Sequence, residues 1–149
     1  MEYISAEEFL KQPVEVQNVF LEWWKPSKGD LVNKVVYIHN MSFNKVGCID
    51  YEWLIDIKES EDININDPEE VKQFVLDYIG DFPLLTEGQL RNFIEHKINK
   101  KVDIIHYINE GYILVVDEDI DYSNLGHDLL QAYWKVACQI TNKEVIDNK

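Results

Sequence analysis

A run–turn–run pattern in the last third of the chain constrains the fold more than any other feature. Two apolar runs, Val102 to Ile108 and Tyr112 to Val116, flank the short turn signal Asn109-Glu110-Gly111. This arrangement predicts an antiparallel β-hairpin. One face of such a hairpin has to be buried against another element of the fold. We expect this covered face to carry the apolar residues Ile104, Ile113 and Val115.

A second hairpin is predicted earlier in the chain. Lys34 to His39 is a β-branched and aromatic run, and Val46 to Ile57 alternates apolar and polar residues around Trp53. The polar stretch from Asn40 to Asn44 separates the two runs and indicates a turn. We therefore expect two antiparallel strands over residues 34–57.

Helix-start signals surround both hairpins. Ser5-Ala6-Glu7-Glu8 and Thr86-Glu87-Gly88-Gln89 are capping boxes, and Asp67-Pro68 places a capping side chain before a proline at the first helical position. Apolar spacing predicts a further helix from Val14 to Trp24 and a C-terminal helix from about Leu125 to Thr141.

These elements predict the order α-α-β-β-α-α-β-β-α. That order indicates an α+β fold, a mainly antiparallel sheet of two hairpins covered by helices. We expect a single domain over residues 1–149, because no linker is long enough to divide the chain.

The charge of the chain is concentrated in its middle. Of the net charge of −14, residues 50–121 carry −13, from 19 acidic and six basic side chains. Phosphate contacts require Lys and Arg, so we do not expect direct nucleic-acid binding. The acidic segment is either a solvated surface or a face that binds a partner with a basic surface.

The candidate partner-binding residues follow from this charge pattern. We expect two acidic groups to face solvent, in a loop before Asp67 and in a loop after the second hairpin. Trp24 lies toward the edge of the apolar helix face that contains Trp23, and exposed tryptophans often anchor interfaces. The candidates are Trp24, Glu59, Glu61, Asp62, Asp117, Glu118, Asp119 and Asp121.

No motif predicts catalysis, a cofactor or a metal site. The acids from Asp117 to Asp121 resemble the start of a calcium loop, but Tyr122 stands where that loop requires glycine. The four histidines lack zinc-ligand spacing, and no serine elbow or glycine-rich phosphate loop is present. We expect a non-enzymatic protein in which Cys48 and Cys138 are small buried apolar residues.

Three segments carry a resemblance to a known group of proteins. Residues 4–26, which include Ile4-Ser5-Ala6-Glu7-Glu8 and Glu22-Trp23-Trp24-Lys25-Pro26, and the segments 83–91 and 128–137 resemble small uncharacterised proteins from phages and prophages of low-GC Gram-positive bacteria. The resemblance covers about a third of the chain and brings no catalytic residues. It implies a viral protein that acts in the host cytoplasm.

This context favours a binding protein, such as an anti-CRISPR-like inhibitor of a host defence protein. A phage replication or housekeeping accessory is an alternative. A binder of a nucleotide signal is another, and it would need a positive pocket. The cations available to such a pocket within the acidic segment are Lys58, Lys72, Arg91, Lys97, Lys100 and Lys101.

No apolar run is long enough to span a membrane, no signal-peptide pattern is present, and the oligomeric state is left open.

Overall fold

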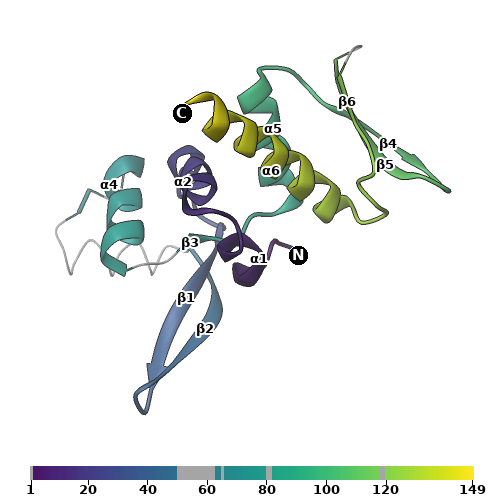
Figure 1. Cartoon of the computed structure of the whole chain (residues 1–149). Coiled ribbons are helices and arrows are strands. Elements are labelled where there is room, and N and C mark those ends of the chain that lie inside the picture. The colour runs from purple at the N-terminus through teal and green to yellow at the C-terminus, as the bar shows by residue number, and fades with distance from the viewer. Residues whose placement is uncertain (1, 50–62, 65, 80–81, 118–119) are drawn as a thin grey trace. The chain divides into compact units, whose positions relative to one another are not determined.

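The computed structural model describes residues 2–49, 63–64, 66–79, 82–117 and 120–149. Helices and antiparallel sheets make it an α+β protein, as the sequence predicts (Figure 1). The chain forms two compact units. The first unit comprises residues 1–20 and 85–149, the second comprises residues 21–84, and the boundary lies within helix α2.

Four helices contribute to the first unit: α1 (Ala6–Leu10), α2 (Val14–Trp23), α5 (Glu87–Ile98) and α6 (Leu129–Asp147). The predicted caps are present. The Ser5 hydroxyl accepts a hydrogen bond from the Glu8 N–H at 3.2 Å, and Thr86 with Gln89 forms a reciprocal capping box. Helix α6 begins later than predicted because Asp128 caps it, accepting from the Gln131 N–H at 2.8 Å.

An aromatic cluster forms the centre of the first unit. The fully buried ring of Phe20 lies 4.5 Å from the ring of Phe93 and 5.2 Å from that of Trp134, between centroids. Phe9 contacts Phe20 edge-on at 6.2 Å. These contacts join α1 and α2 to α5 and α6, which pack against each other (Figure 1).

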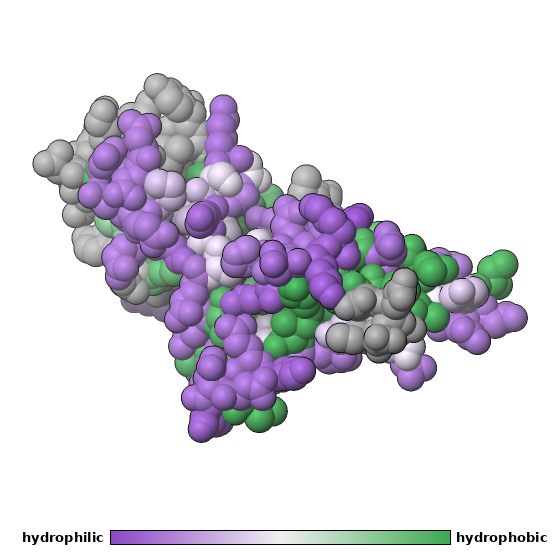
Figure 2. Space-filling model, turned by 90° about the horizontal axis from the view of Figure 1, so that it is seen from above, coloured by the Kyte–Doolittle hydropathy of each residue, from purple (hydrophilic) through white to green (hydrophobic). Residues whose placement is uncertain are grey.

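The predicted hairpin at residues 102–116 forms strands β4 (Asp103–Tyr107) and β5 (Gly111–Asp117). Strand β6 (Ile120–Tyr122) extends it to a three-stranded antiparallel sheet. The predicted covered face was wrong for β5, because Leu114 and Val116 are buried whereas Ile113 and Val115 are half-buried. Ile105, Tyr107 and Ile108 in this hairpin and its turn are exposed. Figure 2 shows hydrophobic surface at its right-hand end, where the hairpin lies.

The second unit contains a three-stranded antiparallel sheet in the order β2-β1-β3. Strands β1 (Leu31–Ile38) and β2 (Met41–Cys48) form the first hairpin, and β3 (Phe82–Pro83) pairs with the start of β1. The predicted turn at Asn40–Asn44 was wrong: His39 and Asn40 alone connect the strands, with φ of 51° and 64°. Two positive φ angles in succession give the tight turn that suits the twist of a hairpin. The rest of the predicted second strand, beyond Ile49, lies outside the described residues.

Helix α4 (Pro68–Gln73) begins at the predicted Asp67 cap and continues as the π-helical segment η1 (Phe74–Ile79). Its side chains Val71 and Val75 enter a buried cluster with Trp24, Val32 and Ile49. The Lys72 ammonium donates to the Glu22 carbonyl at 2.6 Å and so ties α4 to the end of α2. None of the described helices combines the length and apolarity required to cross a bilayer.

Candidate ligand groove

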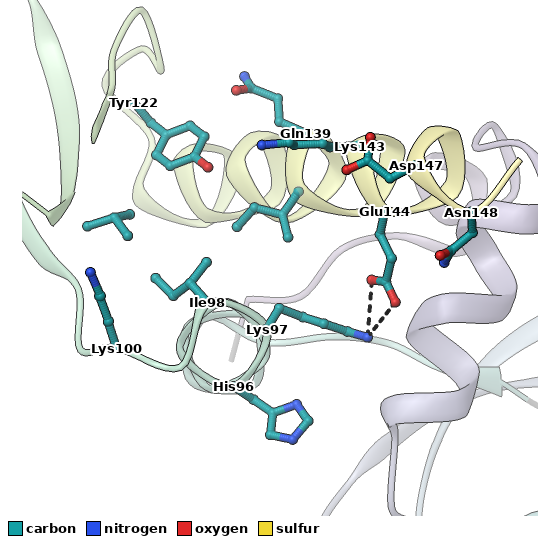
Figure 3. Close-up of a pocket in the computed structure, with 12 residues that line it drawn as sticks. His96, Lys97, Ile98, Lys100, Tyr122, Gln139, Lys143, Glu144, Asp147 and Asn148 are labelled. Atoms are coloured by element: carbon teal, nitrogen blue, oxygen red, sulfur yellow. Dashed lines mark hydrogen bonds and ion pairs between the residues drawn. The ribbon is translucent and has the colours of Figure 1, made fainter. Parts of the chain in front are cut away.

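A groove of about 850 Å³ lies between the C-terminal halves of α5 and α6 in the first unit (Figure 3). Strands β5 and β6 supply one end of it, through Val116 and Tyr122. The volume is in the range of small-molecule sites. We therefore treat this groove as the candidate functional site.

The end of α5 sets one wall of the groove. Asn99 ends the helix in the left-handed conformation, with φ of 55°, and directs the chain to Lys100. Glu95 then accepts a hydrogen bond from the Val102 N–H at 2.9 Å, and Arg91 donates to the Val102 carbonyl at 3.0 Å. These two bonds fix the connection between α5 and β4, so the backbone around Lys100 is held in place.

Apolar side chains form the floor. Val116 is buried, and Ile98, Ile140 and Tyr122 are half-buried. Burial raises the pKa of the Tyr122 phenol, because the phenolate would lose hydration. The phenol therefore stays protonated at neutral pH and presents both a ring face and an O–H donor to a ligand.

The rim of the groove carries more basic than acidic side chains, which is the reverse of the chain as a whole. Lys97, Lys100 and Lys143 line the groove against two acids, Glu144 and Asp147, although the chain has 28 acids and 14 bases. The Lys97 ammonium lies 3.2 Å from the Glu144 carboxylate and neutralises it. Figure 3 shows this ion pair at one end of the groove, whereas Lys100 and Tyr122 lie at the other end.

A second hollow, of about 490 Å³, shares His96 and Lys100 with the groove and is also lined by Asn92, Glu95, Asn99 and Lys101. Figure 3 shows the His96 imidazole pointing away from α6. The amide and amine groups at the end of α5 thus extend the polar surface beyond the groove itself.

Of the predicted acidic site residues, the structure describes Asp117 and Asp121, and it places them on adjacent paired strands. Glu59, Glu61, Asp62, Glu118 and Asp119 lie outside the described residues. Asp117 and Asp121 belong to paired strands, since Asp117 pairs with Ile120 and Asp121 with Val115. The expected open loop after the hairpin was therefore wrong at these two positions, because Asp117 lies in β5 and Asp121 lies in β6, which pairs with β5.

The predicted exposure of Trp24 was wrong. Its side chain is 1% exposed, and its indole N–H donates to the Asp30 carboxylate at 2.9 Å. Helix α2 ends at Trp23, so the helical spacing that placed Trp24 at the edge of the apolar face does not apply one residue later. Trp24 is a core residue, and Trp23 packs against the same cluster while partly exposed.

The two cysteines are free thiols in different surroundings. Burial, followed by the charge of Glu8, raises the pKa of the Cys138 thiol to about 12 and keeps it protonated. Cys48 is exposed at the end of β2, so the expectation that it is buried was wrong.

Sequence reasoning identified two of the groove cations, Lys97 and Lys100, but missed Lys143 and Tyr122. Lys143 lies more than 40 residues from Lys97, and only the packing of α6 on α5 brings the two together. No local pattern in the sequence reports that packing. Comparisons with protein-family models, with curated proteins and with solved structures each found no match.

Proposed function

We propose that this chain is a non-enzymatic binding protein that holds a small anionic ligand of nucleotide type in the groove between α5 and α6. The observation that carries the proposal is that three lysines, one of them paired with Glu144, line a groove with an apolar floor in a chain that has twice as many acids as bases. The resemblance to phage proteins supports a setting in an infected host, where binding such a ligand would withdraw a signal.

The groove suits the two chemical parts of a nucleotide. The exposed amines of Lys100 and Lys143 can donate to phosphate oxygens, and phosphate–ammonium hydrogen bonds are stronger than neutral ones. The Tyr122 ring and the Ile98 and Ile140 side chains offer a surface for a base, since stacking on aromatic rings tolerates any base. Gln139 supplies amide donors and acceptors for the base edge.

A nucleotide panel in thermal unfolding tests this proposal. A ligand at about 100 times its dissociation constant stabilises the folded state by about 2.7 kcal/mol, so a bound nucleotide raises the melting temperature. Adenosine, which lacks phosphate, tests the surface for the base alone. Inorganic phosphate, which lacks the base, tests the lysines alone. We expect the complete nucleotide to stabilise the protein more than either fragment.

Charge-reversed variants locate the site. Lys100→Glu with Lys143→Glu is expected to weaken nucleotide binding at least about tenfold, because two phosphate contacts become repulsive. The matched control is Lys28→Glu with Lys45→Glu, which makes the same change in net charge at exposed positions of the second unit. Equal weakening in both pairs, or no stabilisation by any nucleotide, would contradict the proposal.

A second candidate function is the binding of a host protein with a basic surface, as an anti-defence inhibitor does. The concentration of acids in residues 50–121 favours it. So does the first hairpin, where Ile38, Met41 and Phe43 are 52%, 61% and 48% exposed. Large apolar side chains exposed together are typical of surfaces that a protein partner covers.

Salt-dependent association distinguishes this candidate from the first. Reversing Glu59, Glu61 and Asp62 to lysine should slow association with the partner and flatten its dependence on salt. The matched control reverses Glu2, Glu7 and Glu15, which are exposed acids of the first unit. If both triple variants bind a captured partner as the unmodified chain does, the acidic segment is only a solvated surface.

A further inference from the structure

Two histidines far apart in sequence meet at the surface of the first unit, outside the groove. His106 lies in β4, and His127 lies just before α6. The Nε2 atom of His106 is 3.0 Å from the Nδ1 atom of His127, and both side chains are exposed. No local sequence pattern indicates this pair, because 20 residues separate its members.

The backbone beneath the pair is fixed by a close approach of two glycines. Gly111 and Gly126 form an isolated bridge, and the Tyr112 N–H donates to the Gly126 carbonyl at 2.7 Å. A Cβ atom on Gly111 would lie 2.3 Å from the Gly126 oxygen, so the two segments can approach this closely only with glycine at 111. His106 faces Tyr112 across the hairpin, and their rings lie 4.6 Å apart.

The spacing of the two nitrogens matches ligands of a single metal ion. Metal–imidazole bonds of about 2.0–2.1 Å place two nitrogens about 2.9 Å apart at a right angle and about 3.3 Å apart at a tetrahedral angle. The observed 3.0 Å lies close to the first value. Right-angled nitrogen ligation is the geometry of Cu²⁺ and Ni²⁺ rather than of Zn²⁺.

We propose that His106 and His127 form a two-histidine site for Cu²⁺ or Ni²⁺, with water completing the coordination. Among the described residues no third histidine, cysteine, aspartate or glutamate forms a cluster with them, and the neighbouring Asp128 carboxylate accepts the Gln131 N–H through Oδ1 as the cap of α6. Metal binding replaces the hydrogen bond between the imidazoles. Each ring turns by about 45° so that its nitrogen lone pair points to the metal, and the proton shared between the two nitrogens moves to the outer nitrogen of its own ring. The site differs from the calcium loop considered at Asp117–Asp121, since its ligands are nitrogens and lie elsewhere.

Copper titration of the untagged protein tests the site. We expect one equivalent of Cu²⁺ to bind, with an electron paramagnetic resonance spectrum that shows coupling to two imidazole nitrogens. His106→Gln and His127→Gln should each weaken binding at least tenfold and remove one of the two nitrogen couplings. Both side chains are exposed, so the melting temperature without metal should stay within a few degrees and show that the variants are folded.

The other two histidines provide the matched control. His39→Gln and His96→Gln also remove one exposed imidazole each, and they should leave Cu²⁺ affinity and the spectrum unchanged. The proposal is overturned if these variants weaken binding as much as those at 106 and 127. It is equally overturned if the spectrum of the unmodified protein shows one coordinated imidazole or none.

Discussion

Replacing Trp24 by alanine is expected to lower the free energy of unfolding by about 3–5 kcal/mol. The indole is 1% exposed and lies in the cluster with Val32 and Val71, so alanine leaves a large cavity in the second unit. It also removes the N–H donor of the 2.9 Å hydrogen bond to Asp30. Urea unfolding followed by circular dichroism measures the loss.

Two further variants separate the contribution of packing from that of the hydrogen bond to Asp30. Trp24→Phe removes the donor but keeps an aromatic ring and most of the packing, so we expect a loss of about 1–3 kcal/mol. Trp23→Ala removes a ring of the same size from a partly exposed position and should cost less than half as much as Trp24→Ala. A larger loss at Trp23 than at Trp24 would show that the two rings exchange roles, as their helical spacing alone suggested.

The helix starts could be predicted because their signals are local. Ser5, Asp67 and Thr86 each accept a hydrogen bond from a backbone N–H two or three residues later, and such bonds depend only on neighbouring residues. The same holds for the second hairpin, where Gly111 adopts φ of 86° at the end of the turn. In these places sequence and structure agree to within about two residues.

The strands that were missed are short and depend on distant partners. β3 has two residues and β6 has three, too few to show an alternating pattern. The first hairpin was misplaced because its turn uses His39 and Asn40 in the left-handed region rather than an Asn-Gly pair. The missed signal was the alternation of apolar Met41 and Phe43 with polar Ser42 and Asn44, which was interpreted as part of a five-residue turn.

The candidate groove could be only half predicted for a related reason. Lys97 and Lys100 could be identified from the sequence because they are two of the six basic residues within the acidic segment, residues 50–121. Lys143 lies outside that segment, in a part of the chain with no net charge. Its contribution follows from the packing of α6 on α5, which is a tertiary contact between apolar faces. Counting charges along the chain therefore finds candidate binding residues but does not show which of them lie together in the fold.

The second large effect is expected at Gly111. Gly111→Ala should destabilise the protein by about 3 kcal/mol or more, because a positive φ costs a non-glycine residue about 1–3 kcal/mol and a steric conflict adds to it. Here φ is 86°, and the new Cβ would lie 2.3 Å from the Gly126 oxygen. Relief of that conflict requires the loop at Gly126 to move away from β5, which breaks the hydrogen bond from the Tyr112 N–H. Thermal unfolding monitored by circular dichroism gives the size of the effect.

Two other glycines provide a graded control for this interpretation. Gly126→Ala carries a comparable φ of 79°, but its nearest new contact is the flexible Lys135 ammonium at 3.7 Å, so only the conformational cost should remain. Gly88→Ala lies in the first turn of α5 with no atom within 4 Å and should stabilise the protein by about 0.5–1 kcal/mol. If Gly111→Ala cost no more than Gly126→Ala, the close approach of the two backbones would be wrong. The backbone geometry that sets the spacing of His106 and His127 would then be wrong as well.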